Sequence, residues 1–240
     1  MTRILISTLL TFTFWHSPAY AQKLIEAHMS IAQGRDDGPK VALTFDACTG
    51  KADNRILDAL IQNNIAATIF VTARWLKVNP NAITRLKSRP DLFEIENHGA
   101  RHVPAIDEPL LVYGIASAGT PAAVKTEVTE GAKAVTAAFG TQPHWFRGAT
   151  ALYTASSEKL ITDMKFKIAG FSISGDGGAS YSSPKAARAI SGAKDGDVII
   201  AHINQPLKPA GAGVVKGILM LKSQGYEFVT LDGGASQRGH

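Results

Sequence analysis

Residues 41–48 read Val-Ala-Leu-Thr-Phe-Asp-Ala-Cys, a mostly apolar run with an acidic residue near its end. The run predicts a strand over Val41–Phe45 that is apolar enough for burial on both faces of a sheet. Strands of this kind are typical of parallel sheets that helices cover on both sides. Asp46 then falls at the carboxyl end of the strand, the edge where parallel α/β folds build their binding sites. This stretch therefore indicates both a fold class and the place of a site.

The rest of the chain repeats the alternation of strand and helix. Further strands are expected at Ala67–Val71, Phe93–Glu96, His144–Phe146, Lys167–Ser172, Val198–Ala201 and Glu227–Leu231. Helices are expected at Arg55–Asn63, Pro80–Ser88, Ala122–Phe139, Ser156–Met164 and Val214–Gln224. This alternation predicts an α/β fold with a mainly parallel sheet, which is either open and doubly wound or closed into a barrel. The spacing of the strands does not choose between the two.

The composition is that of a globular protein. The chain has 240 residues, of which 45% are hydrophobic and 19% charged, and these fractions exclude a disordered or fibrous chain. Its single cysteine, Cys48, excludes a disulfide scaffold and a cysteine-rich zinc site within one chain. The formal net charge is +5, but lysine and arginine are scattered along the sequence. Since no basic cluster stands out, we expect no nucleic-acid partner.

Residues 1–21 have the features of a secretory signal peptide. Arg3 precedes an apolar stretch over residues 4–15, and residues 19–21 form a small-x-small cleavage pattern. The apolar stretch is too short for a membrane anchor, and no later segment is long and apolar enough to span a bilayer. We therefore expect residues 22–240 to form a single exported domain, periplasmic or secreted. The sequence does not indicate an oligomeric state.

Polar side chains recur where the expected strands end. They are Asp46 after the first strand, His98 and His102 after the third, Arg147 after the fourth, Asp176 after the fifth and His202 after the sixth. Because the carboxyl ends of parallel strands meet at one edge of a sheet, we expect these side chains to lie together. The segment 103–120, which mixes Pro, Gly, Ser and Ala, is expected to be a surface excursion near the same edge.

His98 and His102 form the sharpest local signal. On a helical turn, their i, i+4 spacing would point both imidazoles the same way. Two neutral imidazoles suit Zn²⁺ or another borderline divalent metal. Histidine pairs at this spacing are also often solvated, so the spacing alone is weak support for a metal site. Their place directly after an expected strand strengthens the metal interpretation.

The other polar residues each allow a structural and a functional interpretation. Asp46 could be a metal ligand, a general base or a helix cap, and Arg147 could pair with it and hold it ionised. His202 could be a hydrogen-bonded core residue or take part in proton transfer. Cys48 could be a nucleophile, a soft metal ligand or a buried small residue, of which the last is the commonest.

The order of four motifs resembles that of a known family. The motifs are Thr44-Phe45-Asp46, Asn97-His98-x-x-x-His102, Phe146-Arg147 and Ile200-Ala201-His202. This order resembles the polysaccharide deacetylases of the NodB-homology type, carbohydrate esterase family 4, over roughly residues 40–231. The resemblance implies a distorted (β/α)7 barrel of the glycoside hydrolase–deacetylase type, and so chooses the barrel over the open sheet.

The resemblance also implies roles for five residues. His98 and His102 match the family's two metal-binding histidines, and Asp46 matches its general base. Arg147 matches the arginine that orients this base, and His202 matches the general acid. The implied cofactor is a divalent metal ion, with zinc as the first choice, that polarises the acetyl carbonyl and activates water. The implied substrate is an N-acetylated polysaccharide, such as peptidoglycan or a chitin-type oligomer, which releases acetate.

Several positions depart from the family pattern. The family's third metal ligand is a second Asp directly after the base, and here that position is Ala47. Gly99 stands where Ser or Thr is usual, and residues 148–150 read Gly-Ala-Thr where the family usually has prolines and an aromatic residue. The metal could be held by the two histidines and water, or another acid could supply the third ligand; the choices are Asp46, Asp53 and Asp176. Two alternatives to the deacetylase remain: a non-catalytic carbohydrate-binding protein on a degenerate barrel, and a metal-free C–N hydrolase of a small amide.

Overall fold

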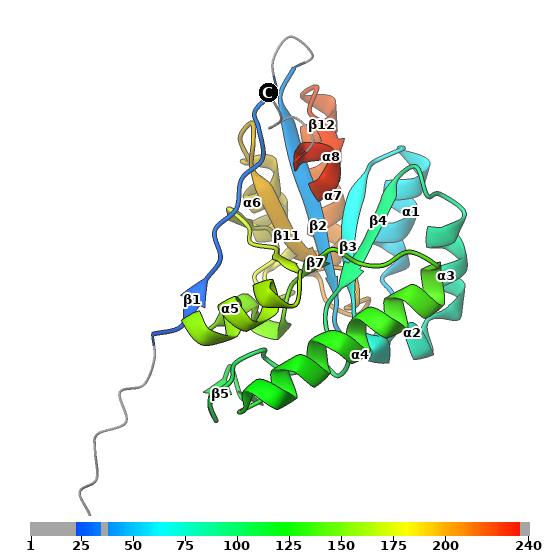
Figure 1. The fold of residues 1–240 in the computed structure, drawn as a ribbon. Helices are drawn as coiled ribbons and strands as arrows, with labels where there is room; N and C mark the ends of the chain where they lie inside the picture. The colour runs from blue at the N-terminus through cyan, green and yellow to red at the C-terminus, as the bar shows by residue number, and fades with distance from the viewer. Residues whose placement is uncertain (1–22, 35–37, 236–240) are drawn as a thin grey trace, which may run out of the picture.

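The computed structural model describes residues 23–34 and 38–235, and it is organised around one parallel sheet (Figure 1). In spatial order, the strands of this sheet are β10 (Ile173–Ser174), β11 (Val198–His202), β2 (Lys40–Ala47), β3 (Ala67–Val71), β4 (Phe93–Asn97), β7 (Trp145–Phe146) and β9 (Lys167–Ile168). A further parallel strand, β12 (Glu227–Val229), pairs with the first half of β2. The sheet curls into a half-barrel of the (β/α)7 type, as the resemblance to the deacetylase family implies.

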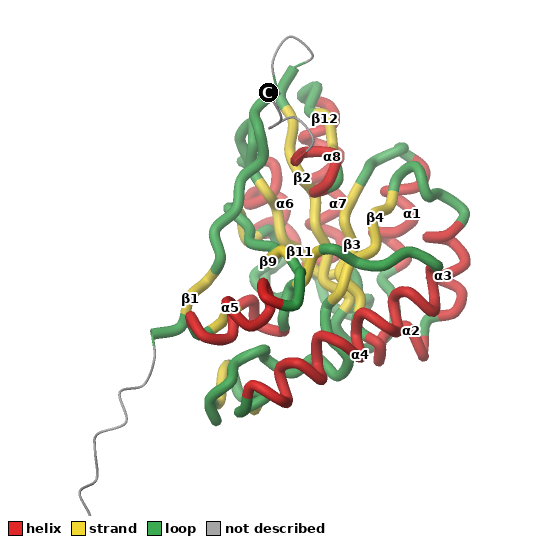
Figure 2. The backbone as a smooth tube through the Cα atoms, in the orientation of Figure 1, coloured by secondary structure: helices red, strands yellow, loops and turns green. Residues whose placement is uncertain are grey.

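Helices cover the outer, convex face of the sheet (Figure 2). They are α1 (Asn54–Gln62), α2 (Ala73–Val78), α3 (Pro80–Lys87), α4 (Pro121–Phe139), α5 (Ala155–Asp163), α6 (Ser183–Ser191) and α7 (Ala210–Ser223). Contacts join α6 to α7, α7 to α1, α2 to both α3 and α4, and α4 to α5. The short helix α8 (Leu231–Ala235) instead packs against β2 after the last strand.

The two faces of β2 are used differently because side chains alternate along a strand. Leu43, Phe45 and Ala47 belong to the large apolar core that the sheet forms with its helices. Thr44 and Asp46 lie on the other face, toward the concave interior, where both contact Arg147. The strand therefore anchors the fold through one face and presents polar groups on the other.

The two end strands of the half-barrel, β9 and β10, are not paired with each other among the described residues. The amino-terminal segment lies across the opening. Its strand β1 (Ile25–Glu26) pairs with β8 (Leu152–Tyr153), and single bridges join His28 to Phe171 and Ser30 to Asp197. Two short strands, β5 (Leu111–Val112) and β6 (Ile115–Ala116), form a hairpin within the segment 103–120, and the 3-10 helix η1 (Ala149–Ala151) follows β7.

Most of the predicted elements are present, with three corrections. The strand predicted over Lys167–Ser172 is shorter than expected. Only its first two residues form a strand, β9, and the chain then crosses to β10. The segment that carries the two histidines is not a helical turn, since Gly99 has φ +86° and His102 has φ +63°. Helices α2 and α6 are additional. The expected signal peptide lies outside the described residues.

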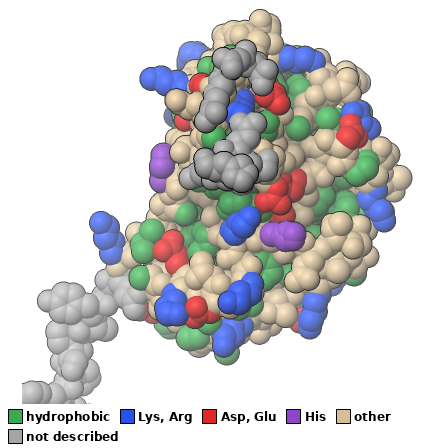
Figure 3. Space-filling model, turned by 45° about the horizontal axis from the view of Figure 1, so that its top comes forward, with side chains coloured by type: hydrophobic (Ala, Val, Ile, Leu, Met, Phe, Trp, Pro, Cys, Tyr) green, Lys and Arg blue, Asp and Glu red, His purple; other side chains and the backbone are tan. Residues whose placement is uncertain are grey.

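Surface charge on the face shown in Figure 3 is mixed, with Lys and Arg side chains interspersed among acidic ones. Within the described ranges, none of the helices has the length and hydropathy needed to cross a membrane.

Candidate active site

Strand register places Asp46 and His202 side by side. The two residues are direct partners in the parallel pairing of β2 with β11. Both strands end at this level, so both side chains lie at the carboxyl edge of the sheet and line the same cavity of about 580 Å³. Cys48, His102 and Asp176 also line it. The sequence prediction that polar groups would gather at this edge therefore agrees with the geometry.

Arg147 crosses the concave interior from the end of β7 and is fully buried. Its Nη1 lies 3.0 Å from Oδ1 of Asp46 and 3.0 Å from the hydroxyl of Thr44. Its Nε and Nη2 donate to the backbone carbonyls of Ala169 and Gly170. Each arm of the guanidinium thus has an acceptor, as a buried cation requires. Arg147 holds both the Asp46 carboxylate and the chain after β9.

The Asp46 carboxylate is kept ionised by its neighbours. Its burial opposes ionisation, but the positive charges of His98, Arg147 and His202 outweigh the burial and lower the pKa of Asp46 below its ordinary value. Oδ1 is occupied by Arg147, whereas Oδ2 lies 3.8 Å from Nε2 of His98. The carboxylate is therefore charged and fixed in orientation.

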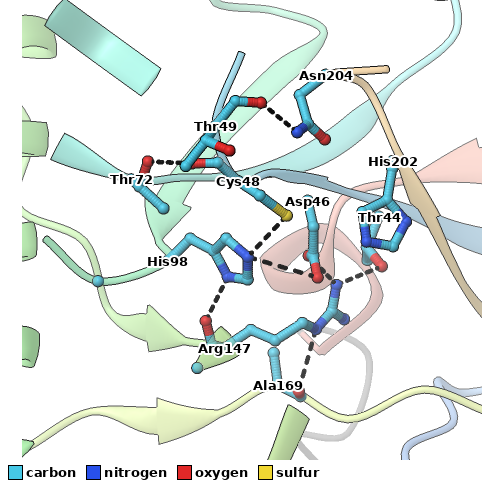
Figure 4. Close-up of polar contacts among 12 residues, drawn as sticks. Thr44, Asp46, Cys48, Thr49, Thr72, His98, Arg147, Ala169, His202 and Asn204 are labelled. Carbon is cyan, nitrogen blue, oxygen red and sulfur yellow. Dashed lines mark hydrogen bonds and ion pairs between the residues drawn. The ribbon is translucent and has the colours of Figure 1, made fainter. Parts of the chain in front are cut away.

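His98 follows β4 directly and is 1% exposed. Its Nδ1 lies 2.6 Å from the backbone carbonyl oxygen of Arg147 (Figure 4). A carbonyl oxygen only accepts, so Nδ1 carries a hydrogen and donates it. Nε2 then faces Oδ2 of Asp46 and Sγ of Cys48, the latter at 3.4 Å. Burial lowers the pKa of His98, but Asp46 and Cys48 raise it by more, so the surroundings of Nε2 favour a positive charge.

His102 reaches the same place through a left-handed backbone conformation. Its ring centroid lies 5.1 Å from that of His98, with the rings tilted by 58°. The turn between them is held by Glu127 of α4, whose Oε1 accepts hydrogen bonds from the backbone of Arg101 and Val103. A Cβ at position 99 would lie 2.5 Å from this oxygen. Gly99 is therefore required by close approach to α4, and the helical spacing rule does not explain the pairing of the imidazoles.

Cys48 lies beside the histidines, with its side chain buried. Burial raises the pKa of the thiol, but the charge of His98 and hydrogen bonds from His102, His202 and His98 lower it well below its ordinary value. Among the described residues, its Sγ forms with His98 and His102 a group whose ligand atoms all lie within 4.8 Å of one another. A buried small residue is the commonest role of a lone cysteine in a sequence. The signal for a place in the site is the two-residue spacing from Asp46, which puts both side chains on one side of extended backbone.

His202 is oriented by Asp176. Nδ1 of His202 lies 3.0 Å from Oδ1 of Asp176, and the backbone N–H of His202 donates to Oδ2 of the same carboxylate. Burial lowers the pKa of His202, but the hydrogen bond with Asp176 and the nearby Cys48 raise it well above its ordinary value. Its side chain is 17% exposed, so the imidazole is partly buried and lines the cavity.

The three acids considered as a third metal ligand have different surroundings in the structure. Asp53 is the N-cap of α1 and forms an ion pair with Arg55, so it is not part of the site. Asp176 is engaged with His202. Asp46 remains near His98, but Arg147 holds one of its oxygens. Ala47 is fully buried in the apolar core behind the sheet, so its side chain faces away from the histidines.

The donors present fit a divalent metal ion of borderline or soft character. Imidazole and thiolate are ligands that zinc, cobalt and nickel accept, whereas magnesium and calcium prefer oxygen. Nδ1 of His98 donates to a backbone carbonyl, which is the usual support of a metal-binding imidazole. Two imidazoles and a thiol thus lie close enough together to share one ion.

The segment 103–120 borders the cavity, as its sequence indicates. Tyr113 and Ile115 from the β5–β6 hairpin line the cavity, and Tyr113 is 81% exposed. Phe171 lines it as well. An open cavity with exposed aromatic and apolar walls, next to a buried polar cluster, can hold a ligand whose polar group reaches the cluster.

Comparisons with known proteins identify the type of domain. The family model for polysaccharide deacetylase matches residues 33–169, more than half of the chain. A bifunctional xylanase/deacetylase from Pseudobutyrivibrio xylanivorans is 24% identical over 192 residues. The match covers 80% of this chain but only 29% of that protein.

Solved structures share the fold. A peptidoglycan N-acetylglucosamine deacetylase superposes with a TM-score of 0.69, at 22% identity and with coverage of 87% of this chain and 92% of the other. A pseudoenzyme of carbohydrate esterase family 4 from Bacillus anthracis superposes with a TM-score of 0.63, at 18% identity and with coverage of 83% and 66%. At these identities the structures establish the fold alone.

Proposed function

This chain belongs to the polysaccharide deacetylase family, and we propose that it is an active hydrolase that removes N-acetyl groups from an N-acetylated glycan. The observation that carries the proposal is the pairing of Asp46 with His202 across β2 and β11 at one cavity. Their surroundings push the two pKa values apart, so that Asp46 is ionised and His202 protonated. A base and an acid prepared in this way are what amide hydrolysis needs.

In the proposed mechanism, the ionised Asp46 removes a proton from the water that attacks the acetyl carbonyl. Arg147 keeps the carboxylate ionised and fixes its orientation through Oδ1. As the C–N bond breaks, His202 donates its proton from Nε2 to the leaving nitrogen, and Asp176 holds the ring through Nδ1. The products are acetate and a free amino sugar, and the atoms of water are shared between them.

His98 and His102 would hold the divalent metal ion that the family uses. When bound there, the ion would polarise the acetyl carbonyl and lower the pKa of the attacking water. The residues fit this role because Nε2 of His98 faces Asp46 and Cys48, whose negative charges would favour a cation at that place. Zinc is the first candidate, since imidazoles suit it.

The glycan assignment rests on the family and on the shape of the site. The hairpin residue Tyr113 and Phe171 both line the cavity and give it aromatic surfaces, on which sugar rings can stack. A periplasmic or secreted location, expected from residues 1–21, would bring the protein to a cell-wall polymer. Peptidoglycan and chitin-type oligomers are therefore the substrates to test first.

Acetate release from N-acetylglucosamine oligomers and from peptidoglycan fragments tests the proposal. We expect turnover that a chelator removes and that Zn²⁺ or Co²⁺ restores. Asp46→Asn should lower kcat by about 10²–10⁴-fold, whereas Asp58→Asn, at a partly buried ion pair with Arg85 that does not line the cavity, should leave it unchanged. Folded protein that releases no acetate from any glycan would refute the hydrolase.

A second candidate, glycan binding without turnover, is favoured by one observation. Position 47, the residue after Asp46, offers no metal ligand. This candidate predicts that N-acetylglucosamine oligomers bind with unchanged affinity to His98→Ala and that no acetate appears. A third, metal-free hydrolysis of a small amide, predicts activity that a chelator does not affect.

A further inference from the structure

We propose that the Cys48 thiolate is the third protein ligand of the metal ion, so that this chain has a Cys-His-His site formed with His98 and His102. The inference rests on the proposed function in so far as the metal serves hydrolysis. It assigns the position left open by Ala47 to the residue that follows it. The support comes from the side to which each residue points, from the distances among the donor atoms and from the contacts that hold the loop.

The direction of the side chains separates position 47 from position 48. Side chains alternate along extended backbone, so Ala47 points into the core formed with the helices, where it is fully buried. Asp46 and Cys48 point to the opposite side and both line the cavity. A donor at position 48 therefore reaches the histidines without any rearrangement of β2, whereas a donor at position 47 does not.

The distances suit a shared ion. Sγ of Cys48 lies 3.4 Å from Nε2 of His98. Two atoms bound to one tetrahedral zinc at the usual Zn–S and Zn–N lengths lie about 3.6 Å apart. The ligand atoms of Cys48, His98 and His102 all lie within 4.8 Å of one another, so closure around an ion requires small side-chain movements. Three protein ligands and one open position are the usual arrangement of a catalytic zinc.

The backbone around Cys48 is held in place. Thr72 donates its hydroxyl hydrogen to the carbonyl oxygen of Cys48, and the side chain of Asn204 donates to the carbonyl oxygen of Thr49 (Figure 4). The side-chain amide of Asn79 donates to the carbonyl of Gly50 at 2.8 Å. These contacts fix the turn that follows β2, and so they fix the thiol beside the imidazole that Arg147 orients.

The ligand set has a chemical consequence. A thiolate and two imidazoles favour zinc, cobalt or nickel and disfavour magnesium and calcium, which prefer oxygen ligands. Asp46 is then free of the metal and keeps its hydrogen bond with Arg147, which suits a general base. A bound ion would also cover the thiol and protect it from oxidation and alkylation.

Cobalt substitution tests the ligand directly. The full chain is freed of metal, loaded with Co²⁺ and its absorption spectrum recorded. A sulfur-to-cobalt charge-transfer band in the near ultraviolet is expected for the unchanged protein and should be absent in Cys48→Ser. Zinc should bind Cys48→Ser at least tenfold more weakly. His144→Ala, which removes an exposed histidine away from the cavity, should retain both the band and the affinity.

Other outcomes would overturn the ligand. Cobalt binding that needs His98 but gives no charge-transfer band would leave a site of histidines without sulfur. An acetyl group found on Cys48 by mass spectrometry during turnover would make the thiol a nucleophile instead. Circular dichroism and thermal unfolding check that Cys48→Ser is folded, and zinc protection of the unchanged thiol against iodoacetamide gives an answer without any variant.

The two proposals can fail separately. A charge-transfer band without acetate release would support the Cys48 ligand and refute the hydrolase. Acetate release that depends on metal, together with no band and unchanged zinc affinity in Cys48→Ser, would support the hydrolase and refute the ligand.

Discussion

Nη1 of Arg147 lies 3.0 Å from Oδ1 of Asp46, although the strands that carry the two residues are separated by β3 and β4 in the sheet. The contact spans the concave interior of the half-barrel, where Arg147 is fully buried and Asp46 is 5% exposed. The same guanidinium donates to Ala169 and Gly170, where the chain passes from β9 toward β10. One side chain thus connects the first strand of the site with the opening of the barrel.

Removal of this cation should destabilise the fold. Arg147→Met leaves the Asp46 carboxylate buried without its partner, and we expect a loss of about 3–5 kcal/mol in the free energy of unfolding, as measured by denaturant titration. The double variant Arg147→Met/Asp46→Leu removes both charges and should recover part of this loss. A single variant as stable as the unchanged protein would show that the ion pair does not hold the interior.

The role of His202 as proton donor predicts a dependence on the leaving group. With N-acetylglucosamine oligomers, His202→Gln should lower kcat by about 10²–10⁴-fold, because an amine needs protonation to leave. With 4-nitrophenyl acetate, whose leaving group needs no proton, the loss should be much smaller. Asp46→Asn is the comparison and should be impaired on both substrates. Equal losses for His202→Gln on both would contradict the assignment.

Introducing an acid at position 47 should harm the fold without improving the site. Ala47 is fully buried in the apolar core behind the sheet, so Ala47→Asp places a carboxylate where it has no partner. We expect the free energy of unfolding to fall by a few kcal/mol and the zinc affinity to stay the same or decrease, as followed by thermal unfolding and zinc titration. Tighter zinc binding by this variant would show that position 47 can reach the histidines.

Glu96 should make the protein less stable as the pH rises. Burial is the largest cause that raises the pKa of Glu96, and the charges of Glu94 and Asp232 act in the same direction. Hydrogen bonds from the backbone of Trp145 and His144 oppose them, and the net result is a pKa raised from 4.5 to about 8. The folded state therefore binds a proton that the unfolded state has released. This contribution to stability is complete below the unfolded pKa of 4.5 and is lost as the pH rises through about 8.

Denaturant titration across this pH range tests the assignment. Glu96→Gln keeps an acceptor for the two backbone N–H groups but cannot ionise. Its free energy of unfolding should fall less steeply between about pH 5 and about pH 9 than that of the unchanged protein. Parallel pH profiles for the two proteins would show that Glu96 is not the group responsible.

Tyr113 should contribute to binding of the glycan and not to the chemical step. It lies on the β5–β6 hairpin at the cavity and is 81% exposed. We expect Tyr113→Ala to raise KM for glycan oligomers by about 2–10-fold, the equivalent of one aromatic contact, with kcat little changed. Leu111→Ala alters an exposed residue of the same hairpin that does not line the cavity, and it serves as the control. A fall in kcat alone would argue against a binding role.

Local sequence patterns were enough to predict the fold class. Parallel strands covered by helices are apolar throughout, so β2, β3 and β11 were visible as short apolar runs. The ends of these strands were also visible, and Asp46, His98, Arg147 and His202 were expected at one edge for that reason. Short elements such as β10 were missed or misplaced, because two residues do not make a pattern.

Only the tertiary structure decided how the site is assembled. The two histidines converge because Glu127 on α4 holds a left-handed turn around Gly99, and a contact between segments so far apart in the chain has no local signature. The place of Cys48 was decided in the same way: the sequence allows a lone cysteine several roles, and only the fold brings its Sγ next to Nε2 of His98. Apolar patterns record which face of an element is buried, whereas the partners of a buried polar group depend on which distant segments pack against it.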